Sequence, residues 1–322
     1  MQLITDQSSP AFPGERSVIT IGAYDGVHLG HQAVIAQVRE LAEARGCRSV
    51  LITFDKHPAT VVRPASAPKL LTSPEQKLDL LGATGIDAVV MIAFDETQAA
   101  ESPESFVTRI IVEHLAASAI VVGEDFHFGS GRDGNVDLLS KMGAEHDFDV
   151  VPLTLVPRSD GIDEPISSTA IRRALAGGDV TRANALLGHV FEVNGRVVQG
   201  DQRGRLLGFP TANVEVPNRL CIPADGVYAG IYERENGDTH HCAINLGRRP
   251  TFYEFAETSL LEAHLLDFDG DLYGEAATVR FTHFLRSERK FDGIDALIEQ
   301  LRFDVEHAKT LLIDFEASRD SA

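Results

Sequence analysis

Residues 22–31 read Gly-Ala-Tyr-Asp-Gly-Val-His-Leu-Gly-His, and this stretch decides the fold of the first half of the chain. It follows an apolar, β-type run at residues 17–21 and precedes residues 32–38, whose apolar positions recur at helical spacing. We therefore predict a strand-to-helix turn, where the free N–H groups of a helix N-terminus can bind an anion. Gly22 and Gly26 permit tight turns and a close approach of phosphate to the backbone.

The two histidines of this turn point to nucleotide chemistry. His28 and His31 are three residues apart, so they are expected to share one face of the first helical turn. Gly30 between them is expected to leave a gap wide enough for a base or a triphosphate. Together these features predict a cradle for a nucleotide whose α-phosphorus is attacked.

Length, composition and charge limit which classes of protein and which binding partners are possible. The chain has 322 residues, which suits two domains, and its 43% apolar and 24% charged residues are typical of a soluble globular protein. Acidic residues outnumber basic ones by 48 to 29, and the net charge of −19 argues against nucleic-acid binding through general electrostatic attraction. We therefore expect small-molecule partners, with local basic residues holding any phosphates.

Cysteine content and hydropathy predict a cytoplasmic protein. The three cysteines, Cys47, Cys221 and Cys242, are widely spaced and form neither a disulfide framework nor a metal knuckle. No apolar run reaches the roughly 18 residues needed to cross a bilayer, and residues 1–6 do not resemble an export signal. We expect no membrane partner.

Strand and helix signals alternate through the first half of the chain. Predicted strands lie at residues 48–54, 87–93, 119–123 and 149–153, with helices at 74–81, 102–115 and 135–144. Short apolar strands that alternate with helices indicate an α/β domain with a parallel sheet covered on both faces. Ligands of such sheets bind at the carboxyl ends of the strands, where Asp55 and Asp125 follow two of the predicted strands. Each aspartate alone could be an ordinary turn carboxylate, but together they indicate one site.

Residues 166–173, Ile-Ser-Ser-Thr-Ala-Ile-Arg-Arg, are a second candidate phosphate site. The hydroxyls of Ser167, Ser168 and Thr169 precede a predicted helix, and Arg172 lies four residues after Ser168 on the same face. Hydroxyls, free N–H groups and a guanidinium suit a departing pyrophosphate. The alternative is a simple Ser/Thr N-cap with a solvated arginine.

The residue types limit the chemistry of this half. The sequence has no recognisable nucleophile–base–orienter triad and no zinc-binding spacing. The substrate is therefore expected to supply its own nucleophile, a phosphate oxygen that attacks the α-phosphorus of ATP as pyrophosphate leaves. Catalysis would consist of positioning and charge neutralisation by His28, His31, Arg172 and Mg²⁺, with no need for a general base.

The second half of the chain has a different pattern. After a helix at residues 179–187, predicted strands at 191–198, 226–232, 240–247, 260–266 and 276–285 are separated by glycine turns, which indicates a small antiparallel β-barrel. Residues 292–315 form one amphipathic helix. Its apolar stripe is expected to pack on the core and comprises Ile294, Leu297, Ile298, Leu301, Val305, Ala308, Leu311 and Leu312.

Two further candidates lie in this second half. Thr211 and Asn213 are two apart in an extended stretch, so both can point to one site and complete the shell of a Mg²⁺ ion held mostly by water and phosphate. Glu262, on a predicted strand, is a candidate general base for a primary alcohol that attacks a γ-phosphate. The alternative for Glu262 is a polar position on the outer face of the strand.

The first half resembles a known family. Residues 22–31 resemble the HxGH signature of the nucleotidyltransferase superfamily, in the form typical of flavin adenylyltransferases, with Tyr24 where that form usually has Phe. Residues 166–172 resemble its second signature and residues 123–129 its aromatic loop, while Lys56 replaces a family proline. The resemblance implies a Rossmann-like nucleotidyltransferase domain in which aromatic rings pack on the flavin. The flavin-binding candidates that it implies are Phe54, Asp55, His57, Asp125, Phe126 and Phe128.

The second half resembles the riboflavin kinase module, on residues 204–213, 225–230, 244–252 and 262–274. The whole order resembles the bacterial bifunctional riboflavin kinase/FAD synthetases, which implies an FMN adenylyltransferase domain at residues 1–187 and a riboflavin kinase domain at 188–322. The partners would be riboflavin, FMN, FAD and ATP, with Mg²⁺ at Thr211 and Asn213. Catalytic roles would fall to Glu262, His28, His31 and Arg172. The candidates for binding ATP and phosphate are Gly22, Tyr24, Asp25, Gly26, Gly30, Ser167, Ser168, Thr169, Gly204, Arg205, Gly208, Thr211 and Asn213.

Two other functions are compatible with parts of the sequence. An HxGH enzyme could use a different acceptor, as cytidylyltransferases and pantetheine-phosphate adenylyltransferases do, but the aromatic loop and the second domain argue against this. A flavin sensor that binds without turnover would be favoured by loss of a signature histidine, of Glu262 or of Asn213, and all of these are present. The sequence does not determine an oligomeric state.

Overall fold

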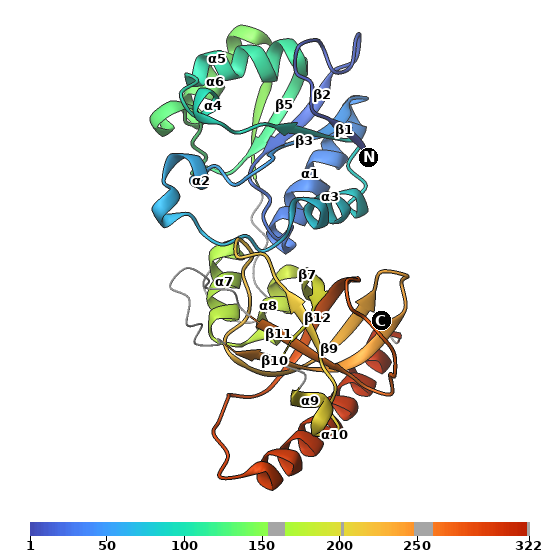
Figure 1. Ribbon diagram of the computed structural model, residues 1–322. Coiled ribbons are helices and arrows are strands. Elements are labelled where there is room, and N and C mark those ends of the chain that lie inside the picture. Colours follow the sequence, from blue (N-terminus) through green and yellow to red (C-terminus); the bar gives the residue numbers. More distant parts are fainter. Residues whose placement is uncertain (154–164, 201–202, 248–259, 321–322) are drawn as a thin grey trace. The chain divides into compact units, whose positions relative to one another are not determined.

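The computed structural model describes residues 1–153, 165–200, 203–247 and 260–320 (Figure 1). The chain forms two compact units, one of residues 1–68 and 74–166, the other of residues 69–73 and 167–322. This division lies between Ile166 and Ser167, before the predicted domain boundary at residue 187. The α/β fold and the barrel expected from the sequence are both confirmed.

The first unit is built on a six-stranded sheet in the order β1-β4-β3-β2-β5-β6. All of its strand pairs are parallel, as the alternation of strand and helix predicted. The carboxyl ends of neighbouring strands therefore meet at one edge. The strands are β1 (Gln2–Ile4), β2 (Ser17–Ile21), β3 (Arg48–Phe54), β4 (Ala88–Ile92), β5 (Ala117–Val122) and β6 (Asp149–Pro152).

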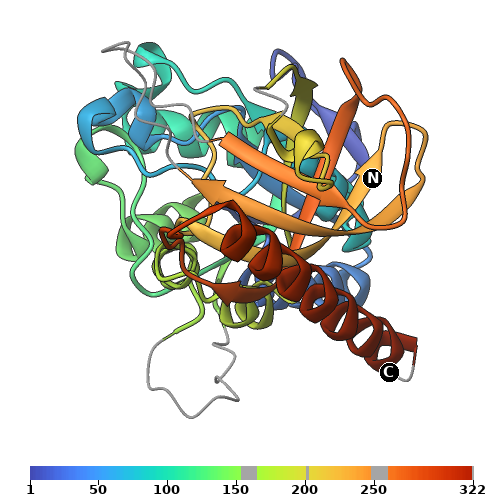
Figure 2. The ribbon, with the colours of Figure 1, turned by 60° about the horizontal axis from the view of Figure 1, so that its bottom comes forward.

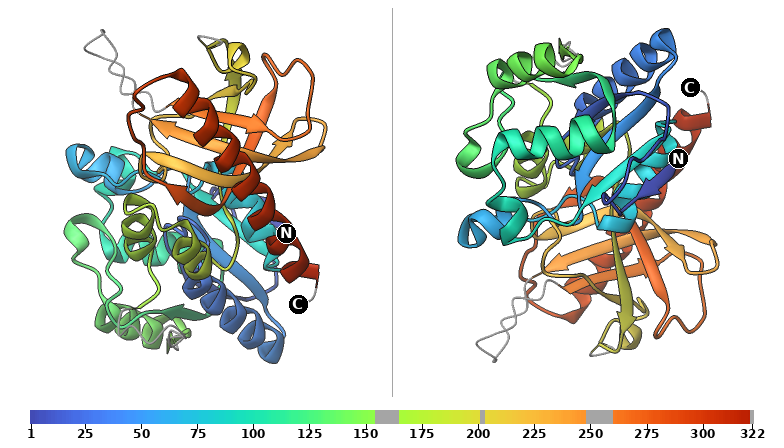
Figure 3. Two further views of the ribbon diagram at one scale, coloured as in Figure 1. Left: turned by 90° about the horizontal axis from the view of Figure 1, so that it is seen from below. Right: turned by 90° about the horizontal axis from the view of Figure 1, so that it is seen from above.

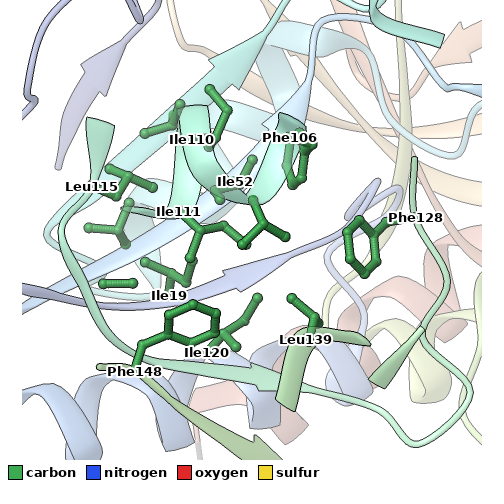
Figure 4. Packing of buried hydrophobic residues seen from close by; sticks show 14 of the residues in the cluster. Ile19, Ile52, Phe106, Ile110, Ile111, Leu115, Ile120, Phe128, Leu139 and Phe148 are labelled. Carbon is green, nitrogen blue, oxygen red and sulfur yellow. The ribbon is translucent and has the colours of Figure 1, made fainter. Parts of the chain in front are cut away.

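Helices cover both faces of this sheet (Figure 3). On one face α1 and α3 pack on Val18, Leu51 and Val121, while α5, the π-helix η2 and α6 pack on the alternate residues of the same strands. Figure 4 shows this second cluster, in which Phe106, Ile110 and Leu139 approach Ile19 and Ile120. Side chains that alternate across a strand explain why each strand is apolar throughout. The helices are α1 (Leu29–Arg45), α2 (Ala59–Val62), η1 (Pro64–Ser66), α3 (Pro74–Ala83), α4 (Glu96–Ala99), α5 (Pro103–Phe106), η2 (Val107–His114), η3 (Ser130–Arg132) and α6 (Val136–His146).

Sequence reasoning missed the first strand. β1 pairs in parallel with β4 at the edge of the sheet, in the register Gln2↔Ala88 to Ile4↔Val90. A three-residue strand at an edge carries too little periodicity to be recognised, because its pairing depends on a partner more than eighty residues away.

The second unit contains a closed barrel in the order β10-β11-β8-β7-β12-β9. Its strand pairs are antiparallel, as expected from the short strands separated by glycine turns. The strands are β7 (Phe191–Val198), β8 (Ala212–Glu215), β9 (Gly226–Arg234), β10 (Thr239–Gly247), β11 (Leu260–Leu265) and β12 (Ala276–Arg286), and a short helix, α9 (Arg203–Leu206), lies between β7 and β8.

The long helix α10 (Ile294–Asp320) lies along the barrel (Figure 2). Ala308 and Leu312 are buried against Ala229, which confirms the apolar stripe in the middle of the helix. At its start the prediction was wrong, because Ile294 is 65% exposed. Ile294 is the first residue of the helix, and helical side chains point toward the preceding turn, so its side chain extends beyond the helix end.

Two helices ahead of the barrel, α7 (Ser168–Ala176) and α8 (Val180–Leu187), belong to the same compact unit. Asn184 explains part of this grouping. Its carboxamide accepts a hydrogen bond from the backbone N–H of Phe191 at 2.7 Å and donates one to the carbonyl of Phe281 at 2.9 Å. These bonds tie α8 to β7 and β12. No helix in the described part of the chain is long and apolar enough to cross a membrane.

Candidate functional site

The first loop of the α/β unit joins β2 to α1 and carries the histidine signature. Its backbone is strained, because Tyr24 (φ 50°) and Val27 (φ 38°) adopt left-handed conformations together with Gly26 (φ 86°). Non-glycine residues in this region cost of order 1–3 kcal/mol each and persist only where the surroundings fix them. Asp25, between them, is buried at 5% exposure.

The histidines lie together, as their spacing predicted. His28 is the N-cap of α1, and its Nδ1 accepts a hydrogen bond from the backbone N–H of His31 at 3.3 Å. The two imidazole rings stack with centroids 3.6 Å apart and planes 15° from parallel. The predicted gap at Gly30 was wrong: a Cβ there would lie 3.2 Å from the His28 ring and 3.3 Å from the carbonyl oxygen of Ile166. Gly30 is thus needed for close packing.

His31 is held in its neutral form. Burial lowers its pKa well below the usual value, and the neighbouring His28 lowers it further. Its Nδ1 is buried and has no hydrogen-bond partner in the described part of the chain. His31 therefore offers a hydrogen bond and not the positive charge that we expected from the sequence.

Tyr24 shows how this loop accommodates a hydroxyl where the signature usually has phenylalanine. The side chain is buried, and its hydroxyl shares a 2.8 Å hydrogen bond with Oγ1 of Thr20. Its ring lies 4.8 Å from that of His31, and a Cβ at Gly22 would approach it to 3.1 Å. Burial raises the pKa of Tyr24, so the phenol stays protonated.

The second loop follows β3 and holds three flavin-binding candidates. Phe54 packs edge-on against Phe94 at 5.1 Å between ring centroids. Asp55 accepts hydrogen bonds from the backbone N–H groups of Lys56 at 2.8 Å and of Phe94 at 2.9 Å. His57 accepts one from the N–H of Ala59 at 3.1 Å. These contacts order the loop at the carboxyl ends of β3 and β4.

The loop after β5 carries the aromatic candidates. Phe126 stacks on Phe128 with centroids 5.4 Å apart, and Phe128 in turn packs on Phe106 in the core (Figure 4). Phe128 is only 8% exposed, so Phe126 is the more accessible ring of the pair. Asp125 is exposed beside them.

The hydroxyl-rich stretch lies at the start of α7, in the second compact unit. Ser167 is the N-cap of this helix, and its Oγ accepts a hydrogen bond from the N–H of Ala170 at 3.2 Å. Ser168 is half-buried and Thr169 is exposed. Nε of Arg172 donates to the carbonyl oxygen of Lys69 at 2.7 Å. Ser167 thus fits the N-cap alternative, and the pairing of this stretch with the first loop stays a prediction.

In the barrel, strand register places three polar residues side by side. Glu262 on β11 pairs with Asn213 on β8 and, on its other side, with Asn245 on β10. Directly paired residues of antiparallel strands share a face, with Cβ atoms about 4.5–5.5 Å apart. Oδ1 of Asn213 is buried and has no hydrogen-bond partner among the described residues.

These residues line a cavity of about 740 Å³. A second cavity of about 290 Å³ shares two wall residues with it, Thr211 and Asn213. The larger one is also lined by Leu297, Leu301 and Val305, so the stripe of α10 forms a wall of the site as well as packing on the core. Such a pair of cavities can hold two ligands that meet at Thr211 and Asn213.

Charged groups anchor α10 at the larger cavity. Arg286 donates from Nε to Asp304 at 3.0 Å and from a second guanidinium nitrogen at 2.7 Å, and Asp304 is 3% exposed. The pKa of Glu288, another lining residue, is raised by burial and by the negative charges of Asp225 and Glu262, although Arg286 opposes this. The cavity therefore contains carboxylates that repel one another.

The glycine-rich loop before β8 is closed by backbone contacts. The N–H of Phe209 donates to the carbonyl of Gly204 at 2.8 Å, and a side chain at Gly204 would collide with Phe209. Gly208 has a φ of 86°. Arg205 lines the smaller cavity. Residues 201–202 of this loop, and residues 248–252 of the stretch that resembles the kinase module, lie outside the described part of the chain.

Sequence reasoning missed two residues. Lys77 on α3 is buried next to the first and second loops, and Asn245 pairs with Glu262. Helical spacing marks Lys77 only as one polar position among many, and strand register cannot be read from one sequence. Neither residue had a signal that could have identified it.

Magnesium fits the donor set between the cavities. Among the residues that the structure describes, no group of three or more His, Cys, Asp or Glu could hold a metal ion. A Mg²⁺ ion keeps most of its ligands as water and phosphate oxygens, so one hydroxyl and one amide oxygen suffice. The unpartnered Oδ1 of Asn213 is such an oxygen.

Comparisons with known proteins identify relatives of both halves of the chain. A family model described as FAD synthetase matches residues 13–170, and one described as riboflavin kinase matches residues 187–312. A bifunctional riboflavin kinase/FMN adenylyltransferase of Listeria monocytogenes is 37% identical over 93% of each chain, and one of Escherichia coli is 38% identical over 91% of each. A crystal structure from Streptococcus pneumoniae, described as a macrolide-efflux protein, is 30% identical with a TM-score of 0.84 and covers 95% of this chain and 98% of its own.

Proposed function

The chain belongs to the family of bifunctional riboflavin kinases/FMN adenylyltransferases, and on this premise we propose which residues carry out its two reactions. It phosphorylates riboflavin with ATP to give FMN, and it transfers an adenylyl group from a second ATP to FMN to give FAD and pyrophosphate. The main observation behind the residue roles is that Glu262 pairs with Asn213 and that both line one cavity. The same chain also contains the stacked pair His28 and His31.

We place the FMN adenylyltransferase domain at residues 1–187 and the riboflavin kinase domain at residues 188–322. The extents of the two family matches, 13–170 and 187–312, support this boundary. The FAD synthetase match includes Ser167, Ser168 and Thr169, although these residues fold with the barrel unit. We assign these three residues to phosphate binding in the first reaction.

In the kinase reaction Glu262 is the general base. It takes the proton of the terminal ribityl hydroxyl as that oxygen attacks the γ-phosphorus of ATP, and ADP leaves. Riboflavin occupies the larger cavity and ATP the smaller one, so the hydroxyl and the γ-phosphate meet beside Thr211 and Asn213. Those two residues would hold Mg²⁺, which neutralises charge on the phosphates when bound, while Gly204, Arg205 and Gly208 shape the nucleotide side.

In the adenylyl transfer the phosphate of FMN is the nucleophile and is already ionised at neutral pH. Its oxygen attacks the α-phosphorus of ATP in line, and the bond to pyrophosphate breaks. His31 donates a hydrogen bond to the phosphates, and binding of that negative charge favours its protonation. Gly22, Tyr24, Asp25, Gly26 and Gly30 shape the cradle, while Ser167, Ser168, Thr169 and Arg172 hold the leaving pyrophosphate.

The flavin of this second reaction lies over the loops after β3 and β5. Phe126 offers an accessible ring, with Phe128 behind it, and Asp125 faces the polar edge of the flavin. Phe54, Asp55 and His57 form the other side. Mg²⁺ serves both reactions, and the three free cysteines support a reducing, cytoplasmic setting.

Isotope transfer tests this proposal directly. The purified chain is incubated with riboflavin, Mg²⁺ and ATP labelled at either the γ- or the α-phosphorus, and the flavins are separated by chromatography. We expect the γ-label in FMN and the α-label only in FAD, with neither product when Mg²⁺ is omitted. An α-label that never enters a flavin would contradict the adenylyl-transfer site, and a single ATP site in calorimetry would contradict two separate pockets.

A further inference from the structure

Lys77 is a buried lysine that has no role in either reaction as proposed above. It lies on α3, in the α/β unit, with only 8% of its surface exposed. Lysines are rarely buried unless they are paired, because an ammonium loses its hydration in the interior. Its contacts therefore indicate what the protein gains from it.

The ammonium of Lys77 joins the ends of two neighbouring strands. Its Nζ donates to the carbonyl oxygen of Phe54 at 2.7 Å, to Oγ1 of Thr53 at 3.2 Å and to the carbonyl oxygen of Ala23 at 3.5 Å. Oγ1 of Thr53 also donates to the carbonyl of Ala23 at 3.1 Å. Ala23 opens the first loop after β2, and Phe54 ends β3. One side chain thus fixes the distance between the two strand ends.

The charges around Lys77 come from the same two loops. Burial lowers the pKa of Lys77, while Asp25 of the first loop and Asp55 of the second raise it in part. Asp55 in turn accepts the N–H groups of Lys56 and Phe94. The ammonium is therefore the positive centre between two acidic loops at the carboxyl edge of the sheet.

The strained conformation of the first loop needs contacts that hold it in place. The carbonyl that Lys77 holds, that of Ala23, immediately precedes the strained residues Tyr24 to Val27. A strained loop keeps its conformation only where several contacts determine it. His28 and His31 follow that strained stretch directly, so a shift at Ala23 moves the histidines.

We propose that Lys77 is a positioning residue for adenylyl transfer: its ammonium holds the nucleotide loop that carries His28 and His31 in register with the flavin loop that carries Asp55 and His57. This inference rests on the proposed function of those loops. The FMN phosphate, bound on one side, then meets the α-phosphorus of ATP, bound on the other. Misplacement of reacting groups by about 1 Å can cost about a hundredfold in rate.

The test compares Lys77→Met and Lys77→Arg with a matched control, Lys141→Met, which removes an exposed lysine from α6 of the same unit. FAD formation from FMN is measured as kcat and KM for both substrates, and FMN binding by quenching of flavin fluorescence. We expect Lys77→Met to lower kcat about 10- to 100-fold. The KM values and FMN binding should change much less, and Lys141→Met should match the wild type.

Hydrogen exchange of the sheet amides shows whether the α/β unit of each variant is folded, and the riboflavin kinase activity shows the same for the barrel unit. Lys77→Arg keeps a charge that does not titrate, so it should recover part of kcat. We also expect deprotonation of Lys77 to slow the wild type at alkaline pH, because burial lowers its pKa, and we expect Lys77→Arg not to show this decrease. Amide hydrogen exchange of residues 22–31 should increase in Lys77→Met and not in Lys141→Met.

Three results would overturn the inference. The first is a kcat of Lys77→Met within twofold of that of Lys141→Met. The second is faster hydrogen exchange across the whole sheet of the α/β unit in Lys77→Met, which would mean that Lys77 only stabilises the fold. The third is a Lys77→Arg variant as inactive as Lys77→Met with an unchanged alkaline profile. If His31→Ala also forms FAD normally, the assignment of the first loop fails instead, so the two failures are distinguishable.

Discussion

The first loop of the α/β unit brings His28 and His31 against each other by contacts within one ten-residue stretch, whereas the barrel collects its site residues from distant parts of the chain. The N-cap bond and the ring stack are local. In the barrel, Asn213, Asn245 and Glu262 become neighbours only through antiparallel pairing. Loop geometry therefore defines the first site, and strand register defines the second.

This difference follows the chemistry of the two nucleophiles. A phosphate is already ionised, so the first site needs orientation and hydrogen bonds but no base. An alcohol must lose a proton, so the second site needs a carboxylate at a defined position in an enclosed cavity. The larger cavity, with Glu262 on its wall, meets that need.

The largest expected effect is on the barrel. Glu262→Gln should lower FMN formation by about 10²- to 10⁴-fold, because the amide cannot accept the proton of the hydroxyl. Conversion of FMN to FAD should be unchanged, and Glu215→Gln, at an exposed carboxylate on β8, should leave both rates near wild type. Both rates are measured by chromatography of the flavins. A parallel loss of the two activities would show that the sites are not independent.

The reciprocal effect should come from the first loop. His31→Ala should lower FAD formation by about 10²-fold or more while riboflavin phosphorylation continues, because a donor to the phosphates is lost. The control is His146→Ala, at an exposed position at the end of α6. Coupled assays of FMN and pyrophosphate release separate the two reactions. Unchanged pyrophosphate release would remove His31 from the mechanism.

A smaller effect tests whether each compact unit serves only one of the two reactions. Arg172→Ala should slow FAD formation by about 10- to 100-fold, because a charged hydrogen bond to the departing pyrophosphate is lost. Arg172 folds with the barrel, yet kinase activity should remain. Arg173→Ala, the exposed neighbour, is the control. If kinase activity falls instead, Arg172 serves the barrel site.

The smallest effect concerns stability. The pKa of folded His31 is lowered, so the unfolded chain binds its proton first as pH falls. The free energy of unfolding of the α/β unit should therefore be fully retained above about pH 6.5 and decrease below it, by at most about 1.4 kcal/mol per pH unit. His31→Gln should remove this contribution. Denaturant-dependent hydrogen exchange of the sheet amides measures it, and an identical pH dependence in the variant would contradict it.

Much of the fold could be predicted because its signals are local. The strands at β2, β3 and β5 are apolar runs, and the stripe of α10 recurs at helical spacing. The misses depend on distant partners: β1 needs β4, and Ile294 is exposed although it fits the stripe. The predicted gap at Gly30 failed because the sequence cannot show that the His28 ring and a distant carbonyl fill that space.

The sequence by itself determined the two fold classes, the turn that carries the histidines and the residue types available for each reaction. It could do so because periodicity, glycine positions and side-chain chemistry act within a few residues. Only the tertiary structure decided that Glu262 stands between Asn213 and Asn245, that α10 lines their cavity and that Lys77 joins two strand ends. These neighbours are far apart in the chain, and they meet only through strand pairing and packing of the whole unit.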